Sequence, residues 1–342
     1  MKAIIIDQHG NQNSLKFRDI ETPKPQPDEV LIKVEACGLN HLDIWTREGT
    51  AFPTKLPHVL GCDVVGTVAE LGNGATGVNV GDFVIVAPGW GCGECDMCKA
   101  GNDSLCAHYK MMGRDRWGGY AEYCTAPARC IIPISRKYSA AEWAAMPLVS
   151  LTAYHMLVTR AQLKKGETVL ILAAGSGIGS IAVQLAKHLG ATVIATASTD
   201  EKLEKARALG ANRGINYTTH PEFHKEVKKL TDGRGVNVVF EHVGPATWRS
   251  SSASLAPGGR LVFCGATTGA EVNMNLRFMF VRQLSFLGSF MGNFSELKQV
   301  VPLIESGAIK PVVDSTFPLQ DAAIAHKKME DRNVFGKIVL TN

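Results

Sequence analysis

Four cysteines lie close together in the glycine-rich segment GWGCGECDMCKAGNDSLC, residues 89–106. They are Cys92, Cys95, Cys98 and Cys106, with the spacing C-x2-C-x2-C-x7-C. Four thiolates complete the tetrahedral shell of a zinc ion and leave no position open for a substrate. Ferredoxin-type clusters close with C-x3-C instead, and disulfide frameworks belong to secreted chains. We therefore predict that this lobe, about residues 89–108, binds one structural zinc ion per chain.

A second group of residues is suited to holding a phosphate. Residues 167–191, ETVLILAAGSGIGSIAVQLAKHLGA, predict a buried strand, a turn of small residues and a helix. This arrangement directs backbone N–H groups at the helix N-terminus toward a pyrophosphate. The usual G-x-G-x-x-G is replaced by Ala-Gly-Ser-Gly-Ile-Gly at 174–179, so a plain tight turn remains the alternative. The predicted cofactor-binding residues of the turn are Gly175, Ser176, Gly177 and Ile178.

The end of the following strand indicates which dinucleotide binds. A carboxylate there would bind the ribose hydroxyls of NAD and repel a 2′-phosphate. The strand instead ends at Ala197, and Ser198 and Lys202 offer donors, which favours NADP(H). Asp200 keeps NAD possible, although an acidic residue is also expected at a helix N-terminus. Tyr217, after the third strand, could cover the adenine or be an ordinary strand-end aromatic residue.

The elements that must position these residues fall into two domains. Residues 1–135 contain short β-branched runs separated by turn residues, which predicts a β-rich domain. From about 139 a helical pattern follows and could join the domains, and residues 166–290 then alternate strands with helices, which predicts a parallel sheet covered on both faces. We predict an α/β protein with a β-rich domain at 1–149 and 293–342 and a doubly wound domain at 150–292. His242, Val243, Gly265 and Ala266 follow two of the strands, where such sheets bind ligands.

The composition excludes some classes of function. The 342 residues are 45% hydrophobic and 20% charged, and the net charge of +4 is too small to indicate nucleic acid or a membrane surface as a partner. The start, MKAIIIDQHGNQ, has too short an apolar run for a signal peptide or a membrane span. We expect a cytoplasmic protein that acts on a small molecule. The strands GRLVFCGA and LSFLGSF, expected at the sheet edge, predict a homodimer or homotetramer.

Several stretches together resemble the medium-chain dehydrogenase/reductase family over the whole chain. They are GLNHLD, LPHVLGCDVVGTV, the cysteine lobe, GGYAEY, AAGSGIGSIAVQLAK and FGKIVL. The resemblance implies a GroES-like catalytic domain followed by a Rossmann domain. It also implies a structural zinc lobe and hydride transfer with NAD(P).

Zinc alcohol dehydrogenases of that family hold a second, catalytic zinc through three ligands. The corresponding positions here are Asn40, Cys62 and approximately Leu148, so two of the three cannot act as thiolate or imidazole ligands. Leu42 stands where the family places a proton-relaying hydroxyl. The pattern is more similar to the quinone-oxidoreductase branch, which transfers hydride without a metal, although many members of that branch lack the cysteine lobe.

The resemblance also assigns roles at the reaction centre. Asn40 is expected to donate to a developing oxyanion, and His41 to touch the cofactor pyrophosphate or face solvent. Thr152 is expected beneath the nicotinamide, and Lys337 to reach the phosphates or remain a surface lysine. Three hypotheses follow: an NADPH-dependent quinone or enone reductase without catalytic zinc, a zinc-binding alcohol dehydrogenase or carbonyl reductase, and a non-enzymatic NADPH-binding protein.

Overall fold

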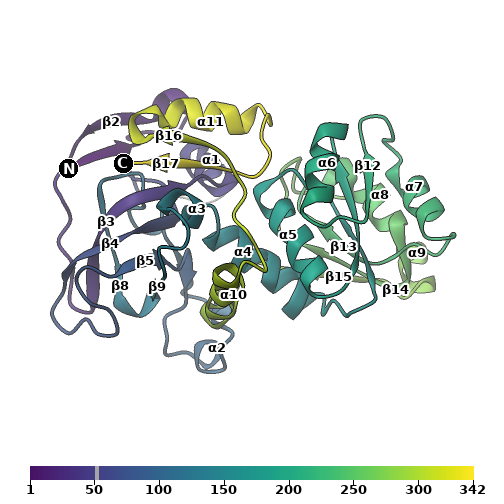
Figure 1. Ribbon diagram of the computed structural model, residues 1–342, viewed down its shortest axis with the longest axis horizontal. Helices are drawn as coiled ribbons and strands as arrows, with labels where there is room; N and C mark the ends of the chain where they lie inside the picture. The colour runs from purple at the N-terminus through teal and green to yellow at the C-terminus, as the bar shows by residue number, and fades with distance from the viewer. Residues whose placement is uncertain (51–53) are drawn as a thin grey trace. The chain divides into compact units, whose positions relative to one another are not determined.

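The structure, a computed structural model, describes residues 1–50 and 54–342 (Figure 1). The chain divides into two compact units. The first comprises Met1–Leu148, Asn293–Glu305 and Pro311–Asn342, and the second comprises Val149–Gly292 and Ser306–Lys310. The first unit is β-rich and the second has a parallel sheet, so the predicted α/β class is confirmed.

A seven-stranded sheet forms the core of the first unit. Its strands run in the order β16-β17-β3-β4-β5-β9, and β8 pairs with β3 outside this path. Two smaller sheets, β1-β2 and β6-β7, complete the unit. The strands are β1 (Lys2–Ile5), β2 (Lys16–Asp19), β3 (Glu29–Gly38), β4 (Asp63–Leu71), β5 (Phe83–Val86), β6 (Gly89–Trp90), β7 (Lys110–Met111), β8 (Tyr123–Pro127), β9 (Ile131–Pro133), β16 (Val313–Pro318) and β17 (Lys337–Thr341).

The last strand of the chain lies beside the first long one. β17 pairs antiparallel with β3, with Val339 opposite Gly38. The backbone N–H of Leu39 then donates to Ile338 O at 2.9 Å. This pairing places Lys337, at the start of β17, next to the residues that immediately follow β3.

The helices of the first unit are short except for one. They are α1 (His41–Glu48), α2 (Asp96–Lys99), α3 (Ala140–Ala144), α10 (Phe294–Ser306) and α11 (Ala322–Glu330). α1 begins directly after β3 with Asn40 as its N-cap, and the carboxylate of Asp43 accepts from the N–H of Asn40 at 2.8 Å. Among the described residues, no helix is both long and apolar enough to cross a membrane.

The second unit is built on a six-stranded parallel sheet. Its order is β12-β11-β10-β13-β14-β15, in which β10 lies where the strand order reverses. Ligands bind such sheets at this point, beyond the carboxyl ends of the strands. The strands are β10 (Thr168–Ile171), β11 (Thr192–Ala197), β12 (Arg213–Asn216), β13 (Val236–Glu241), β14 (Leu255–Phe263) and β15 (Ser285–Gly288).

Helices connect these strands, because each apolar face packs on the sheet. They are α5 (Gly177–His188), α6 (Asp200–Ala208), α7 (Phe223–Leu230), α8 (Pro245–Ser254) and α9 (Leu276–Val281). The helical run predicted from about 139 is not continuous. It divides into α3, α4 (Pro147–Tyr154) and a π-helical segment at His155–Arg160.

The edge of this sheet differs from the prediction. β14 pairs with β13 on one side and β15 on the other, so GRLVFCGA is an interior strand. Of the two segments predicted at the edge, only LSFLGSF, which contains β15, lies there.

Candidate functional site

The four cysteines of the lobe converge as the spacing predicts. Cys95 is the N-cap of α2, Cys98 lies within it, and Cys106 follows a 3-10 helix at Asp103–Leu105. The four sulfur atoms lie within 4.8 Å of one another, and the Sγ atoms of Cys92 and Cys98 are 3.9 Å apart. A Zn–S bond of about 2.3 Å in a tetrahedron requires sulfurs about 3.8 Å apart. The donor set therefore fits zinc.

Backbone N–H groups point at two of the four sulfur atoms of the lobe. The N–H groups of Glu94 and Cys95 point at Cys92 Sγ from 3.5 and 3.4 Å, and they lower the pKa of Cys92 to about 6. Cys106 Sγ accepts from the N–H groups of Cys92 and His108, each at 3.3 Å. In the described part of the chain, no other group of three or more histidine, cysteine or acidic side chains could hold a metal ion.

The position expected for a catalytic zinc holds a different set of groups. Asn40 Nδ2 lies 3.3 Å from Cys62 Sγ and donates to Asp63 Oδ2 at 2.8 Å. The other oxygen of Asp63 accepts from the backbone N–H of Leu148 at 2.7 Å. Cys62 is buried, and burial raises the pKa of its thiol well above the usual value.

Lys337 enters this set from β17, which corrects the prediction of a surface lysine. Only 4% of Lys337 is exposed, so it is not a surface lysine. Its Nζ donates to Leu39 O at 2.5 Å, to Asn40 Oδ1 at 2.6 Å and to Asp63 Oδ2 at 3.0 Å. An ammonium group has three donors, and these three contacts engage all of them. A buried ammonium paired with a carboxylate does not fit a catalytic zinc at this position.

These contacts also fix the orientation of the Asn40 amide. Because lysine only donates, the oxygen of the Asn40 amide must face Lys337. One N–H of the amide then donates to Asp63 Oδ2. The other lies between two acceptors, because Nδ2 is 3.3 Å from Cys62 Sγ and 3.4 Å from Gly38 O. Asn40 thus contacts both Lys337 and Asp63, and its role as an oxyanion donor stays a prediction.

A buried chain of hydrogen bonds extends from the group of Asn40, Asp63 and Lys337. The sequence alone did not predict this chain of hydrogen bonds. Asp43 Oδ1 accepts from the N–H of Gly61 at 3.0 Å, and Tyr120 OH donates to Asp43 Oδ2 at 3.3 Å. Tyr120 OH also lies 3.0 Å from His326 Nε2, and Arg47 Nη1 lies 3.1 Å from His326 Nδ1. Burial raises the pKa of Asp43 to about 6. The segment GLNHLD contains Asp43, but its partners come from segments far apart in the sequence.

In the second unit, the glycine-rich turn leads directly into the N-terminus of α5. Ser176 is the N-cap of α5, and its hydroxyl accepts from the N–H of Gly179 at 3.0 Å. A Cβ atom on Gly179 would lie 2.4 Å from Ala173 O, so only glycine allows the helix to start so close to the strand. The predicted residues Gly175, Ser176, Gly177 and Ile178 thus lie in the turn or first turn of a twelve-residue helix.

The other predicted cofactor residues lie at the same edge of the sheet. The strands are parallel, so the residues that follow them share one edge. Ser198 follows β11, Tyr217 follows β12, and Lys202 lies in the first turn of α6. The remaining residues follow β13 and β14: they are His242, Val243, Gly265 and Ala266. Asp200 is also in the first turn of α6, where it accepts from Asn216 Nδ2 at 3.0 Å, and Thr199 is the N-cap.

The turn after β13 is held by a buried carboxylate that the sequence analysis did not single out. Glu241 is fully buried and accepts from the N–H groups of Val243 and Gly244 at 2.6 and 3.2 Å. The hydroxyls of Thr247 and Ser251 in α8 donate to its other oxygen. His242 Nε2 lies 2.9 Å from Leu172 O, and burial lowers the pKa of this imidazole. Glu241 therefore fixes the backbone of Val243, a predicted cofactor residue, and of the neighbouring Gly244.

Thr152 and His41 lie in different units. Thr152 belongs to α4, and its buried hydroxyl has no hydrogen-bond partner within residues 1–50 and 54–342. An orphaned hydroxyl of this kind fits a residue that meets a bound cofactor. His41 is exposed at the first position of α1, with its ring 6.0 Å from that of Trp45.

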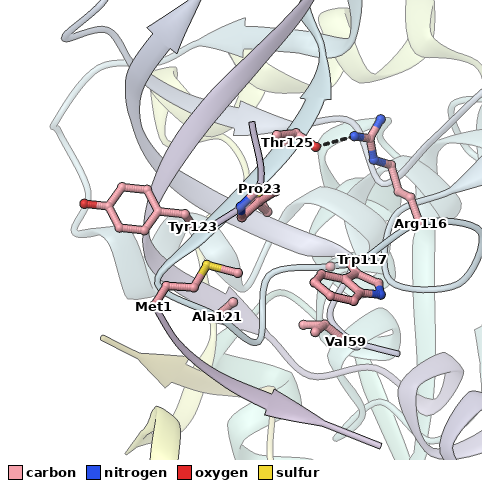
Figure 2. A pocket seen from close by; sticks show the side chains of 10 residues that line it. Met1, Pro23, Val59, Arg116, Trp117, Ala121, Tyr123 and Thr125 are labelled. Carbon is pink, nitrogen blue, oxygen red and sulfur yellow. Dashed lines mark hydrogen bonds between the residues drawn. The ribbon is translucent and has the colours of Figure 1, made fainter. Parts of the chain in front are cut away.

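A separate pocket in the first unit contains none of the predicted site residues. Its volume is about 220 Å³, and its lining includes Met1, Trp117 and Tyr123 (Figure 2). Arg116, which also lines it, donates to Thr125 Oγ1 at 2.5 Å. We assign no function to this pocket.

Comparisons with known proteins match most of the chain. One family model, described as "Alcohol dehydrogenase GroES-like domain", matches residues 26–136, and a second, described as "Zinc-binding dehydrogenase", matches residues 177–306. A solved structure of an NAD-dependent alcohol dehydrogenase is 43% identical, with a TM-score of 0.97 over 100% of both chains.

Curated relatives of full length carry two kinds of name. An NAD-dependent alcohol dehydrogenase of Sulfurisphaera tokodaii is 33% identical and is aligned over 99% of each chain. An acryloyl-coenzyme A reductase of the same organism is 30% identical, again over 99% of each chain. This chain is thus similar both to proteins named alcohol dehydrogenase and to a protein named acryloyl-coenzyme A reductase.

Proposed function

Because this chain belongs to the medium-chain dehydrogenase/reductase family and is an NAD(P)-dependent oxidoreductase, we propose that it transfers hydride from NADPH to a quinone or an α,β-unsaturated carbonyl compound without a catalytic zinc ion. One zinc ion per chain, in the cysteine lobe, is structural. The observation that carries the proposal is the ammonium of Lys337, which occupies the space among Leu39, Asn40 and Asp63.

Conjugated acceptors match a site of this composition. A bound nicotinamide cofactor supplies the hydride. When hydride adds to the β-carbon of an unsaturated carbonyl compound, the electron pair of the double bond moves to the carbonyl oxygen as an enolate, and the α-carbon then takes a proton. Because the charge is delocalised, this reaction depends less on a Lewis acid than reduction of an isolated carbonyl group does. The name of the acryloyl-coenzyme A reductase supports this class of substrate.

The protein's own residues would bind and orient the cofactor. We propose that the turn at Gly175–Ile178 holds the pyrophosphate and that the hydroxyl of Thr152 meets the nicotinamide. His41 remains a predicted cofactor contact. The orphaned hydroxyl and the helix N-terminus support these roles. Ser198 and Lys202, with no carboxylate at the end of β11, support a preference for NADPH, whereas the names of the most similar alcohol dehydrogenases favour NAD.

The second candidate is an alcohol dehydrogenase, which the 43% identity to a structure of that name favours. Rates of NADPH oxidation with a quinone, an enone and a saturated aldehyde separate the two. We expect the conjugated acceptors to react and the saturated aldehyde to react far more slowly. Preferential turnover of aldehydes and alcohols would establish the alcohol dehydrogenase instead.

A further inference from the structure

The ammonium of Lys337 is surrounded by oxygen atoms that could equally bind a metal cation. They are the backbone oxygen of Leu39, the amide oxygen of Asn40 and a carboxylate oxygen of Asp63, at 2.5, 2.6 and 3.0 Å. Carbonyl, amide and carboxylate oxygens are ligands for hard divalent cations. The thiol of Cys62 lies beside them, 3.3 Å from Asn40 Nδ2.

The charges at this place are buried and require compensation. Asp63 is fully buried, and the side chain of Lys337 is only 5% exposed. A second buried carboxylate, Asp43, is 1% exposed and accepts from the N–H of Asn40. A buried carboxylate without a cation nearby is costly. The pair of carboxylates therefore requires a positive charge here, and Lys337 supplies it.

We propose that Lys337 is a built-in cation that closes this site to divalent metal ions. The side chain both fills the space and neutralises the carboxylate that would otherwise attract a metal. This inference deepens the proposed function and rests on it, because the proposed function includes the absence of a catalytic zinc. The test measures metal binding and not turnover. The inference about Lys337 can therefore fail while the proposed substrate class stands, and the proposed substrate class can fail while the inference stands.

The experiment removes the ammonium and counts metal ions. Wild-type protein with its structural site filled is dialysed against Co²⁺, and the bound metal per chain is measured by elemental analysis. Lys337→Ala is treated in the same way, and Lys337→Arg is the matched control because it keeps the positive charge. We expect Lys337→Ala to bind one further Co²⁺ per chain, and the wild type and Lys337→Arg to bind none beyond the structural site.

The position of the additional ion is checked through Cys62. Thiolate coordination gives cobalt an intense charge-transfer absorption, and binding of the metal would deprotonate the Cys62 thiol. We expect this absorption to increase in Lys337→Ala and to lose that increase in the double variant with Cys62→Ser.

Two results would overturn the proposal: a second equivalent of Co²⁺ bound by the wild type, or a folded Lys337→Ala that binds none. If Lys337→Ala does not fold, Lys337→Gln is the second neutral variant and is judged by the same two outcomes.

Discussion

At the scale of single residues, the buried His326 is the clearest pH-dependent group. Because the Arg47 guanidinium only donates, His326 Nδ1 must accept, and Nε2–H then donates to Tyr120 OH. Burial and the Arg47 charge lower the pKa of His326 from 6.5 to about 3. The neutral imidazole thus connects α11 to α1 and to the residues around Asp43.

This shift predicts a loss of stability in acid. A histidine whose pKa is lower in the folded state stabilises the protein fully above pH 6.5, and this contribution decreases as the pH falls toward 3. Between pH 7 and pH 5 the loss is about 2 kcal/mol of unfolding free energy. Urea denaturation of the wild type and of His326→Gln, which does not titrate, measures it. Equal pH dependence in the two proteins would show that His326 is not responsible.

A second prediction concerns Lys202 and the choice of cofactor. A charge-assisted contact with a 2′-phosphate contributes about 1.5–3 kcal/mol. Lys202→Ala should therefore reduce the ratio of NADPH to NADH affinity by about 10- to 100-fold. Lys205→Ala is the control, because Lys205 lies further along α6 and its side chain pairs with Glu201. Tighter binding of NADH than of NADPH by the wild type would refute the assignment.

At the scale of elements, the cysteine lobe should depend on its metal. Cys98→Ser removes one of four converging sulfurs. Because metal binding at such a site is coupled to folding, we expect zinc to be lost and the melting temperature to fall by several degrees. Zinc content and thermal unfolding, with Cys130→Ser as a control outside the lobe, test this. Retention of a full equivalent of zinc by Cys98→Ser would contradict a four-cysteine site.

The edge strand β15 leads to a prediction about assembly. It is the last strand of the sheet, and the preceding α9 exposes Leu276, Phe280 and Val281 at 71%, 69% and 66%. Exposed edges and apolar side chains of this kind are usually covered. We predict a homodimer or homotetramer. Phe280→Glu should weaken the association of the subunits, and Ile324→Glu on α11 should not. Light scattering that shows a monomeric wild type at micromolar concentration would exclude this prediction.

The elements were more predictable from the sequence than the contacts between them. Helices such as α5 and α6 and the strands of the second unit follow local patterns of apolar residues, and the cysteine spacing is itself local. The place of Lys337 is not local. It depends on the pairing of β17 with β3. This pairing brings Lys337 to Leu39 and Asn40, which precede it in the chain by 298 and 297 positions. A lysine at the start of an apolar strand signals only that its charge needs a partner.

At the scale of the whole molecule, the cysteine lobe and the site of Lys337 accommodate positive charge in different ways. The cysteine lobe offers four sulfurs, which saturate a zinc ion. The second site holds an ammonium group instead of a metal. Under the proposed function, the chain combines a structural zinc lobe with a reaction centre for acceptors that need no Lewis acid.

The most direct test of this account measures zinc content and activity on the same preparation. Elemental analysis of wild-type protein that reduces a quinone or an enone with NADPH should give one zinc ion per chain. Two zinc ions per chain, with activity lost when one is selectively removed, would contradict the account and establish a zinc-dependent alcohol dehydrogenase.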